Sequence, residues 1–479
     1  MNKKLATSFL WDFVGKMSHQ IITFIIGVIL ARLLSPKEYG LVGIALVFIV
    51  FSSIFSNLGL NSSLIQRKKV DESHYSSAFF LNVLISFLLA LLLFFSSNLI
   101  ANFFSEPELV PITKVLGLGI IISSFSIVQE SILRRNMRFD ILSKAKVYSA
   151  IIAGIVGVSL ALLKFGVWSL VVQYLINILS KSFFYWIYSD WKPKLLFRIN
   201  SLKELWSFGF SMFLSSFIYT GFNQVSSIVI AKIFSSQDLG LFSRAKTLNE
   251  FVYRYSSESI SAVTFSKMSK MQQNKKKLID LGLKAETLIS FATFGLLGLM
   301  YVTSEPLILM LLGQKWVGAI EIYELLCFSG FVYPISVATL SMLKASGFSK
   351  TNLKLEIIKT FIATIGLVIG FSYGLKGYLT SLIFTGIITV YLNMKFTSNM
   401  LNYSLNRHLK PILSYLIIAV FTTFLMNLIP ISFSYQIVNL ISYAFVYVFV
   451  YLFLNFIFKT EGLFLARTQM LTLFDKKEK

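Results

Sequence analysis

Apolar stretches of about twenty residues, separated by short polar segments, follow one another along almost the whole chain. A helix rises about 1.5 Å per residue, so such a stretch spans the roughly 30 Å hydrocarbon core of a bilayer. The stretches lack the alternation of apolar and polar residues expected of a membrane β-barrel. The pattern predicts an all-α polytopic membrane protein with about fourteen transmembrane helices. The predicted spans are Phe9–Leu34, Tyr39–Leu60, Ser77–Phe103, Val110–Leu133, Val147–Phe165, Val167–Tyr188, Leu205–Phe234, Leu239–Phe265, Leu283–Leu312, Ile320–Lys344, Leu353–Tyr373, Gly377–Met400, Pro411–Ile429 and Tyr435–Phe458.

A short internal repeat organises these spans. Ala31–Leu41 reads ARLLSPKEYGL and Ala231–Leu241 reads AKIFSSQDLGL, without gaps. Six predicted spans separate the copies, so the two halves share one orientation, related by a pseudo-two-fold axis along the membrane normal. We expect two pseudo-symmetric six-helix lobes around a central cavity. The predicted parts are an N-terminal lobe (1–189), a cytoplasmic linker (190–204), a C-terminal lobe (205–400), and an extra helix pair with a basic cytoplasmic tail (401–479).

The formal net charge of +22 reflects topology rather than nucleic-acid binding. Most Lys and Arg residues fall in alternate loops, as the positive-inside rule requires of cytoplasmic loops. Both termini are therefore predicted to be cytoplasmic. A single cysteine, Cys327, excludes a disulfide framework, and the three histidines form no zinc signature. No P-loop is present, and we expect neither a metal nor another cofactor.

The stretch Leu239–Ser261 carries charges inside a predicted span. Lys246, Glu250, Arg254 and Glu258 recur at i, i+4 spacing, which places them on one slowly drifting stripe of a helix. Arg244 adds a fifth charge. Each charge costs roughly 2.5–3.5 kcal/mol at the bilayer centre, so five cost on the order of 15 kcal/mol if they face lipid. We therefore expect the stripe to face water or polar groups, as one wall of a hydrophilic transport cavity.

The repeat provides an internal control for this stripe. Its charged positions from Lys246 to Glu258 align with Leu46, Val50, Ile54 and Leu58 of the first copy. The scaffold accepts apolar residues there, which favours a functional role for the charges. Arg244, Lys246 and Arg254 suit a phosphate or pyrophosphate. The alternative is a self-neutralising ladder that merely solubilises one wall.

Four more polar residues inside predicted spans are candidates. Asp12 and Lys16, four residues apart in the first span, face the same cavity if the lobes are symmetric; a snorkelling pair at the interface is the alternative. Asn223 and Gln224 lie near the middle of the seventh span and could bind sugar hydroxyls. Hydrogen bonding between helices is the commoner use of such amides.

Several segments together resemble a known family. The first outward loop LLSPKEYG, the following NLGLNSSLIQRK, the inward ILRRNMRF and the segment FGVWSLV are similar to Wzx-type polysaccharide flippases. These form the polysaccharide-transport branch of the multidrug/oligosaccharidyl-lipid/polysaccharide exporter superfamily, and the colanic and teichuronic acid exporters are the nearest subgroup.

The resemblance implies a bacterial inner membrane protein that moves undecaprenyl-pyrophosphate-linked oligosaccharide to the periplasmic leaflet by alternating access. It also implies coupling to a proton or sodium gradient, and polymerase or glycosyltransferase partners. Cationic cavity residues are a family expectation, carried here by Arg244, Lys246 and Arg254, with Lys16 as a further candidate. The candidates for ion coupling are Glu250, Glu258 and Asp12.

Two other functions stay open. A multidrug or cation antiporter of the same superfamily needs an acidic cavity, whereas this stripe carries three positive and two negative charges. A polytopic enzyme of polysaccharide assembly, such as a polymerase or ligase, usually has a long periplasmic loop with catalytic groups, but the predicted outward loops are short. Transport without catalysis is therefore the prediction.

Overall fold

The computed structural model describes residues 3–269, 271, 274–429 and 435–475; the side chains of some helical stretches, 252–260 among them, stay undescribed. The described residues form helices and short connections, with no β-strand among them, so the predicted all-α fold class is confirmed. By internal contacts the chain divides into two compact units, Met1–Gly240 (unit 1) and Leu241–Lys479 (unit 2). The lobes predicted from the repeat have other boundaries and stay a prediction.

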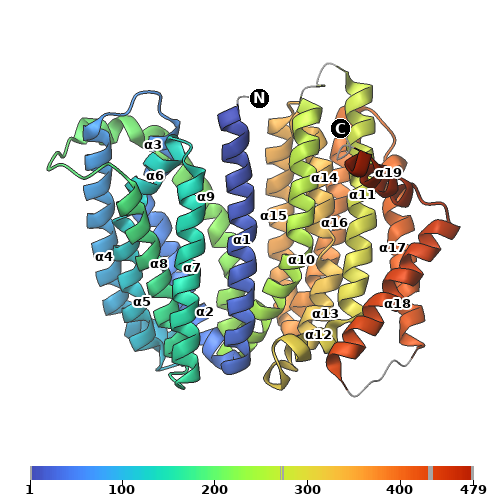
Figure 1. Cartoon of the computed structure of the whole chain (residues 1–479), viewed down its shortest axis with the longest axis horizontal. Helices are drawn as coiled ribbons and strands as arrows, with labels where there is room; N and C mark the ends of the chain where they lie inside the picture. The colour runs from blue at the N-terminus through green and yellow to red at the C-terminus, as the bar shows by residue number, and fades with distance from the viewer. Residues whose placement is uncertain (1–2, 270, 272–273, 430–434, 476–479) are drawn as a thin grey trace. The chain divides into compact units, whose positions relative to one another are not determined.

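Unit 1 is a bundle of long helices. In it α1 and α8 pack against α7, α4 packs against α5, and α9 packs against α2, α3 and α4 (Figure 1). Its helices are α1 (Lys3–Leu33), α2 (Pro36–Asn57), α3 (Leu60–Gln66), α4 (Glu72–Phe104), α5 (Leu109–Ser124), α6 (Ile127–Arg135), α7 (Phe139–Leu162), α8 (Val167–Tyr188), α9 (Ile199–Ile233) and the first turn of α10 (Ser236–Ser269).

Unit 2 contains the rest of α10 and the helices that follow. In it α11 packs against α14, α17 and α19, α16 packs against α13, α14 and α15, and α18 packs against α17. The remaining elements are α11 (Lys275–Val302), α12 (Ser304–Leu311), the 3₁₀ helix η1 (Gln314–Trp316), α13 (Ala319–Ser329), α14 (Val332–Ala345), α15 (Ser349–Ser372), α16 (Gly374–Leu401), α17 (Asn406–Asn427), α18 (Gln436–Ile457) and α19 (Glu461–Asp475).

Within the described residues, eleven helices are long and apolar enough to cross a membrane, or twelve if the bent pair α5 and α6 counts as one span. This establishes a multi-pass membrane protein, whereas the predicted number of fourteen spans is not confirmed. The predicted seventh and eighth spans are helices of 35 and 34 residues, α9 and α10, but neither is among the eleven. For α10 the reason is its charge, since its length of about 51 Å exceeds the thickness of a bilayer.

The predicted span Val110–Leu133 is not one continuous helix. It is divided into α5 and α6, which meet at an angle of 41°. The serine side chains at the break compete for helix carbonyls: Ser124 Oγ donates to Ile121 O at 2.7 Å and Ser126 Oγ donates to Ser123 O at 3.0 Å. The indole Nε1 of Trp186 donates to Phe125 O at 2.8 Å and satisfies a carbonyl at the bend. A polar partner from α8 therefore stabilises the bend.

Two predicted spans of the second half also contain breaks. The predicted span Leu283–Leu312 is divided between α11 and α12, because the ring of Pro306 clashes with a helical carbonyl at Val302, where α11 ends. The predicted span Ile320–Lys344 lies within one candidate span, Ala319–Ala345, in which a short break separates α13 from α14 and Pro334 follows Gly330 by four residues. The predicted basic tail begins with a helix, α19, that packs against α11.

The two copies of the repeat fold alike. Ser35 caps α2: its Oγ accepts from the backbone N–H of Glu38, and the Glu38 carboxylate accepts from Ser35 N at 2.6 Å. At the matching place, Ser235 Oγ accepts from the backbone N–H of Asp238 at 3.0 Å and donates to Asp238 Oδ2 at 2.6 Å. A serine cap paired with an acidic residue three positions later thus starts a helix at the same point in each copy.

A glycine of each copy faces the backbone of the other. A Cβ at Gly40 would lie 1.6 Å from the carbonyl oxygen of Ser236, and a Cβ at Gly240 would lie 1.8 Å from that of Pro36. The first turns of α2 and α10 therefore approach each other more closely than any side chain permits. This contact lies within unit 1, and its reciprocity agrees with the predicted pseudo-symmetry of the two halves.

Candidate functional site

The part of α10 in unit 2 begins with a buried face. The spacing of its buried residues places them on one side of the helix. The Phe242 ring lies 6.2 Å from that of Tyr378 on α16, and Asn249 Nδ2 donates to Cys327 Sγ on α13 at 3.4 Å. The buried side chains are Leu241, Phe242, Ala245, Leu248 and Asn249. Packing on this face fixes the rotation of the helix about its axis.

The charges of the predicted stripe are the less buried part of the same helix. Lys246 Nζ lies 4.0 Å from Glu250 Oε1, and the two side chains are 43% and 34% exposed. The same Nζ lies 5.8 Å from the centre of the Phe242 ring, within cation–π range. Arg244 is half-buried. An i, i+4 ion pair this exposed contributes only about 0.3–0.5 kcal/mol, so stability alone does not account for these charges.

Two residues of the stripe lie farther along α10. The backbone remains helical at Arg254 and Glu258, but their side chains are outside the described residues. Helical periodicity continues the row that Lys246 and Glu250 begin. The assignment of both residues to the substrate or ion site therefore stays a prediction.

The other predicted site residues all lie in unit 1. Lys16 is exposed on α1, and the side chain of Asp12 is outside the described residues. On α9, Asn223 is exposed and its Nδ2 donates to Tyr219 O at 2.8 Å, one turn back, while Gln224 is half-buried. The hydrogen bond of Asn223 stays within its own helix. Their roles in binding stay predictions.

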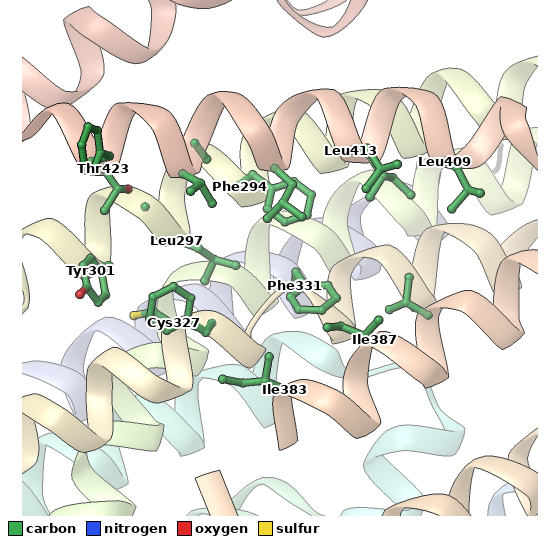
Figure 2. A pocket seen from close by; sticks show the side chains of 18 of the residues that line it. Phe294, Leu297, Tyr301, Cys327, Phe331, Ile383, Ile387, Leu409, Leu413 and Thr423 are labelled. Atoms are coloured by element: carbon green, nitrogen blue, oxygen red, sulfur yellow. The ribbon is translucent and has the colours of Figure 1, made fainter. Parts of the chain in front are cut away.

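Unit 2 contains a cavity of about 680 Å³ that the sequence did not indicate. Figure 2 shows Leu409, Leu413 and Thr423 of α17 along one side and Ile383 and Ile387 of α16 along the other. The cavity lies between these helices because α17 packs on α11 and α18, whereas α16 packs on α13, α14 and α15.

The lining of this cavity is almost entirely hydrocarbon. Phe294 and Leu297 of α11 and Phe331, next to α14, form part of it (Figure 2), and a few uncharged polar groups such as Tyr301 and Asn427 add to it. Among the described residues no charged side chain lines it. The volume is in the range of small-molecule sites, and the chemistry suits an apolar chain rather than a sugar or a phosphate.

Sequence reasoning also missed a buried polar network in unit 2. Glu286 of α11 and His408 of α17 meet at 2.6 Å, with side chains 1% and 0% exposed. His408 Nε2 lies 2.6 Å from the Tyr403 hydroxyl, and Thr339 Oγ1 donates to Glu286 at 3.4 Å. Burial, and then the charge of Glu286, raise the pKa of Tyr403. In the sequence, the one available signal of this network was an acidic residue, Glu286, just inside the predicted span Leu283–Leu312.

Together these features define the class of protein: it is a polytopic membrane protein. One of its helices has a charged face, and unit 2 contains an apolar cavity. Comparison with known families then places it. The chain belongs to the family of polysaccharide biosynthesis proteins, whose model matches residues 29–321. The family resemblance inferred from the sequence is thereby confirmed.

Three curated relatives are similar over most of the chain. The succinoglycan biosynthesis transport protein ExoT of Rhizobium meliloti (strain 1021) is 28% identical over 68% of this chain and 66% of its own length. The lipopolysaccharide biosynthesis protein WzxC of Escherichia coli (strain K12) is 25% identical over 71% and 70%. The teichuronic acid biosynthesis protein TuaB of Bacillus subtilis (strain 168) is 23% identical over 72% and 72%. These names agree with the function predicted from the sequence, transport in surface-polysaccharide biosynthesis.

Solved structures share the fold. The lipid II flippase MurJ in an inward closed conformation matches with a TM-score of 0.76, at 17% identity over 94% of this chain and 98% of that one. An inward-facing multidrug resistance MATE family transporter matches with a TM-score of 0.58, at 17% identity over 80% and 94%. At these identities the matches establish the fold alone, which is that of a polytopic transporter.

Proposed function

We propose that this protein is a flippase that moves undecaprenyl-pyrophosphate-linked oligosaccharide from the cytoplasmic to the periplasmic leaflet by alternating access. It serves the biosynthesis of a surface polysaccharide such as O-antigen, capsule or exopolysaccharide, and it transports this substrate without catalysing a reaction. Its place is the bacterial inner membrane, with both termini in the cytoplasm. The assignment rests on membership in the polysaccharide biosynthesis family and on the names of the relatives.

The observation that carries the proposal is the polar face of α10. Lys246 is partly exposed opposite a face that packs on α13 and α16, and the matching position of the apolar first copy is Leu46. We assign the pyrophosphate to Arg244, Lys246 and Arg254, since charge-assisted hydrogen bonds to phosphate oxygens are strong and Arg can form two. Lys16 is the further cation in this assignment.

The remaining parts of the substrate follow from chemistry. The amides of Asn223 and Gln224 are assigned to sugar hydroxyls, because an amide both donates and accepts hydrogen bonds. The apolar cavity between α16 and α17 is assigned to a segment of the isoprenyl chain. Burial of hydrocarbon there, at about 25 cal/mol per Å², holds the chain without sequence-specific contacts.

Energy input is assigned to a proton or sodium gradient. Glu250, Glu258 and Asp12 are the carboxylates proposed to couple ion binding to transport. The pair of Lys246 with Glu250 at 4.0 Å gives this idea a physical basis, because neutralising the carboxylate frees the ammonium group for the substrate. The proposed partners are the polymerase and glycosyltransferases of the same assembly pathway.

The proposal is tested with the variants Lys246→Ala and Arg254→Ala at preserved protein levels. Losing one charge-assisted contact costs about 1.5–3 kcal/mol, so the appearance of lipid-linked glycan in the periplasmic leaflet should slow by about ten-fold or more. Lys275→Ala, a change of equal charge at the start of α11, is the matched control and should transport normally. Normal transport by both test variants would show that the phosphate assignment is wrong.

A further inference from the structure

A second cavity of about 730 Å³ lies in unit 2 at the beginning of α17, beside α11 and the connection between α18 and α19. It is separate in lining from the apolar cavity and contains none of the residues assigned to the substrate. Its charged side chains are Lys284, Arg407, Lys410, Lys459, Asp280 and Glu461. The excess of basic over acidic groups gives it a positive potential.

Four basic side chains face two acidic ones in this lining, so part of the positive charge is not balanced by the protein. Arg407 pairs with Asp280 at 2.7 Å. Lys284, Lys410 and Lys459 have no ion-pair partner among the described residues, and the one other carboxylate in the lining is Glu461. Three lysines gathered around one cavity repel one another, so an arrangement of this kind favours an anionic ligand.

Two arginines at helix ends of unit 1 are used differently. Arg67 pairs with Glu204, and Arg135 donates to Leu64 O at 2.8 Å and Lys68 O at 2.9 Å. There the cations hold helix ends and connections together. No ion pair of this kind is found for the three lysines of the second cavity among the described residues.

The walls of the second cavity are held in place by close contacts. Tyr415 Oη accepts from the backbone N–H of Gly462 at 2.7 Å, and Thr460 Oγ1 donates to Asn455 at 2.8 Å. A Cβ at Gly462 would lie 2.7 Å from Phe291 Cβ, so the first turn of α19 sits directly on α11. These contacts fix the walls of the cavity, and the exposed side chains of Lys284, Lys410 and Lys459 lie around it.

The position of the cavity points to a lipid. It lies where the candidate spans α17 and α18 begin and end, which is the region of phospholipid head groups. Ile417 of α17 is 65% exposed, and Phe458, directly after α18, is 64% exposed. Acyl chains cover such apolar surface in a bilayer, so a ligand with a charged head and two hydrocarbon tails matches both parts.

We propose that this cavity binds the phosphodiester head group of an anionic phospholipid, with Lys284, Lys410 and Lys459 around the phosphate and the acyl chains along α17 and α18. Basic pockets between membrane helices are suited to such head groups. The site is distinct from the one assigned to the transported substrate. Its occupation holds α19 against α11 and α17.

The experiment measures binding of phosphatidylglycerol to the purified full-length protein in detergent by native mass spectrometry. The variant combines Lys284→Gln, Lys410→Gln and Lys459→Gln, and the control combines Lys275→Gln, Lys276→Gln and Lys277→Gln at the start of α11. Each lysine near an anionic head group contributes a factor of about five, so the first variant should bind about 100-fold more weakly and the control should bind normally.

Three further measurements separate the sources of phosphate and guard against misfolding. Inorganic phosphate and phosphatidylcholine should not displace the bound phosphatidylglycerol. If inorganic phosphate by itself displaced it, the ligand of the cavity would be a free anion and not a lipid. The triple Lys→Arg variant at the same positions should retain binding, because the charge is kept. Equal binding by the Gln variant and its control would overturn the proposal. Lys246→Ala should bind phosphatidylglycerol normally, so the two proposals fail independently.

Discussion

Helices α2 and α10 occupy matching places in the two halves and differ in one respect. Each starts with a serine cap, Ser35 or Ser235, and each has a glycine in contact with the first turn of the other helix. Beyond that turn, α2 continues with apolar residues, whereas α10 carries Lys246 and Glu250 on its exposed face. The beginnings of the helices are alike, and the surfaces that follow are not.

This difference distinguishes the features that both halves need in order to fold from the charges that only one half carries. Caps and glycines satisfy backbone groups and allow close approach, which both halves need. An exposed ion pair adds about 0.3–0.5 kcal/mol, far less than the cost of placing its charges in lipid. The charges of α10 are therefore a feature added to a scaffold that folds without them in its other copy. Three changes test this comparison.

The largest expected effect comes from the glycines. Gly40→Ala or Gly240→Ala places a Cβ within 2 Å of a backbone carbonyl that no side-chain movement can relieve. Either change should lower the free energy of unfolding by about 3 kcal/mol or more, the upper range of overpacking costs. Thermal unfolding in detergent measures it. Gly43→Ala on the same helix meets only the flexible Leu239 side chain, at 3.3 Å, and should stay within about 1 kcal/mol. Equal stability of all three variants would contradict the close contact.

The second-largest expected effect on stability comes from placing a charged residue of the α10 type on α2. Leu46→Lys introduces an ammonium group at the position that matches Lys246 and should destabilise the protein by about 2.5–3.5 kcal/mol if the position faces lipid. The yield of folded protein in the membrane and the unfolding midpoint report the change. Leu46→Met, which keeps the apolar character and volume, is the control. If Leu46→Lys is as stable as the control, the matching face of α2 is also accessible to water.

The smallest effect comes from the caps. Ser35→Ala and Ser235→Ala each remove the side-chain oxygen that accepts a backbone N–H and should each cost about 1 kcal/mol. The costs should be similar, because each serine hydroxyl accepts the backbone N–H three residues on and donates to that residue's carboxylate. Ser211→Ala removes a hydroxyl that donates only within its own helix, to Ser207 O at 3.2 Å, and should change the unfolding midpoint little. If one serine substitution lowered the stability much more than the other, the two caps would not be equivalent and the comparison of the two copies would fail at this point.

The sequence by itself determined the class of protein, the approximate spans, the repeat and the family. These depend on local properties: the length of an apolar run, the residues of a cap, and short segments such as LLSPKEYG. The amphipathic pattern of α10 was readable for the same reason, since residues four apart share a helix face.

Other features depend on residues far apart in the chain, and only the tertiary structure decided them. The bend after α5 involves Trp186, the buried pair joins Glu286 to His408, and the second cavity brings Lys284 together with Lys410 and Lys459. Periodicity shows which side of a helix is polar but not which helix lies opposite. Packing decides this, because contacts between distant segments depend on how whole helices fit together.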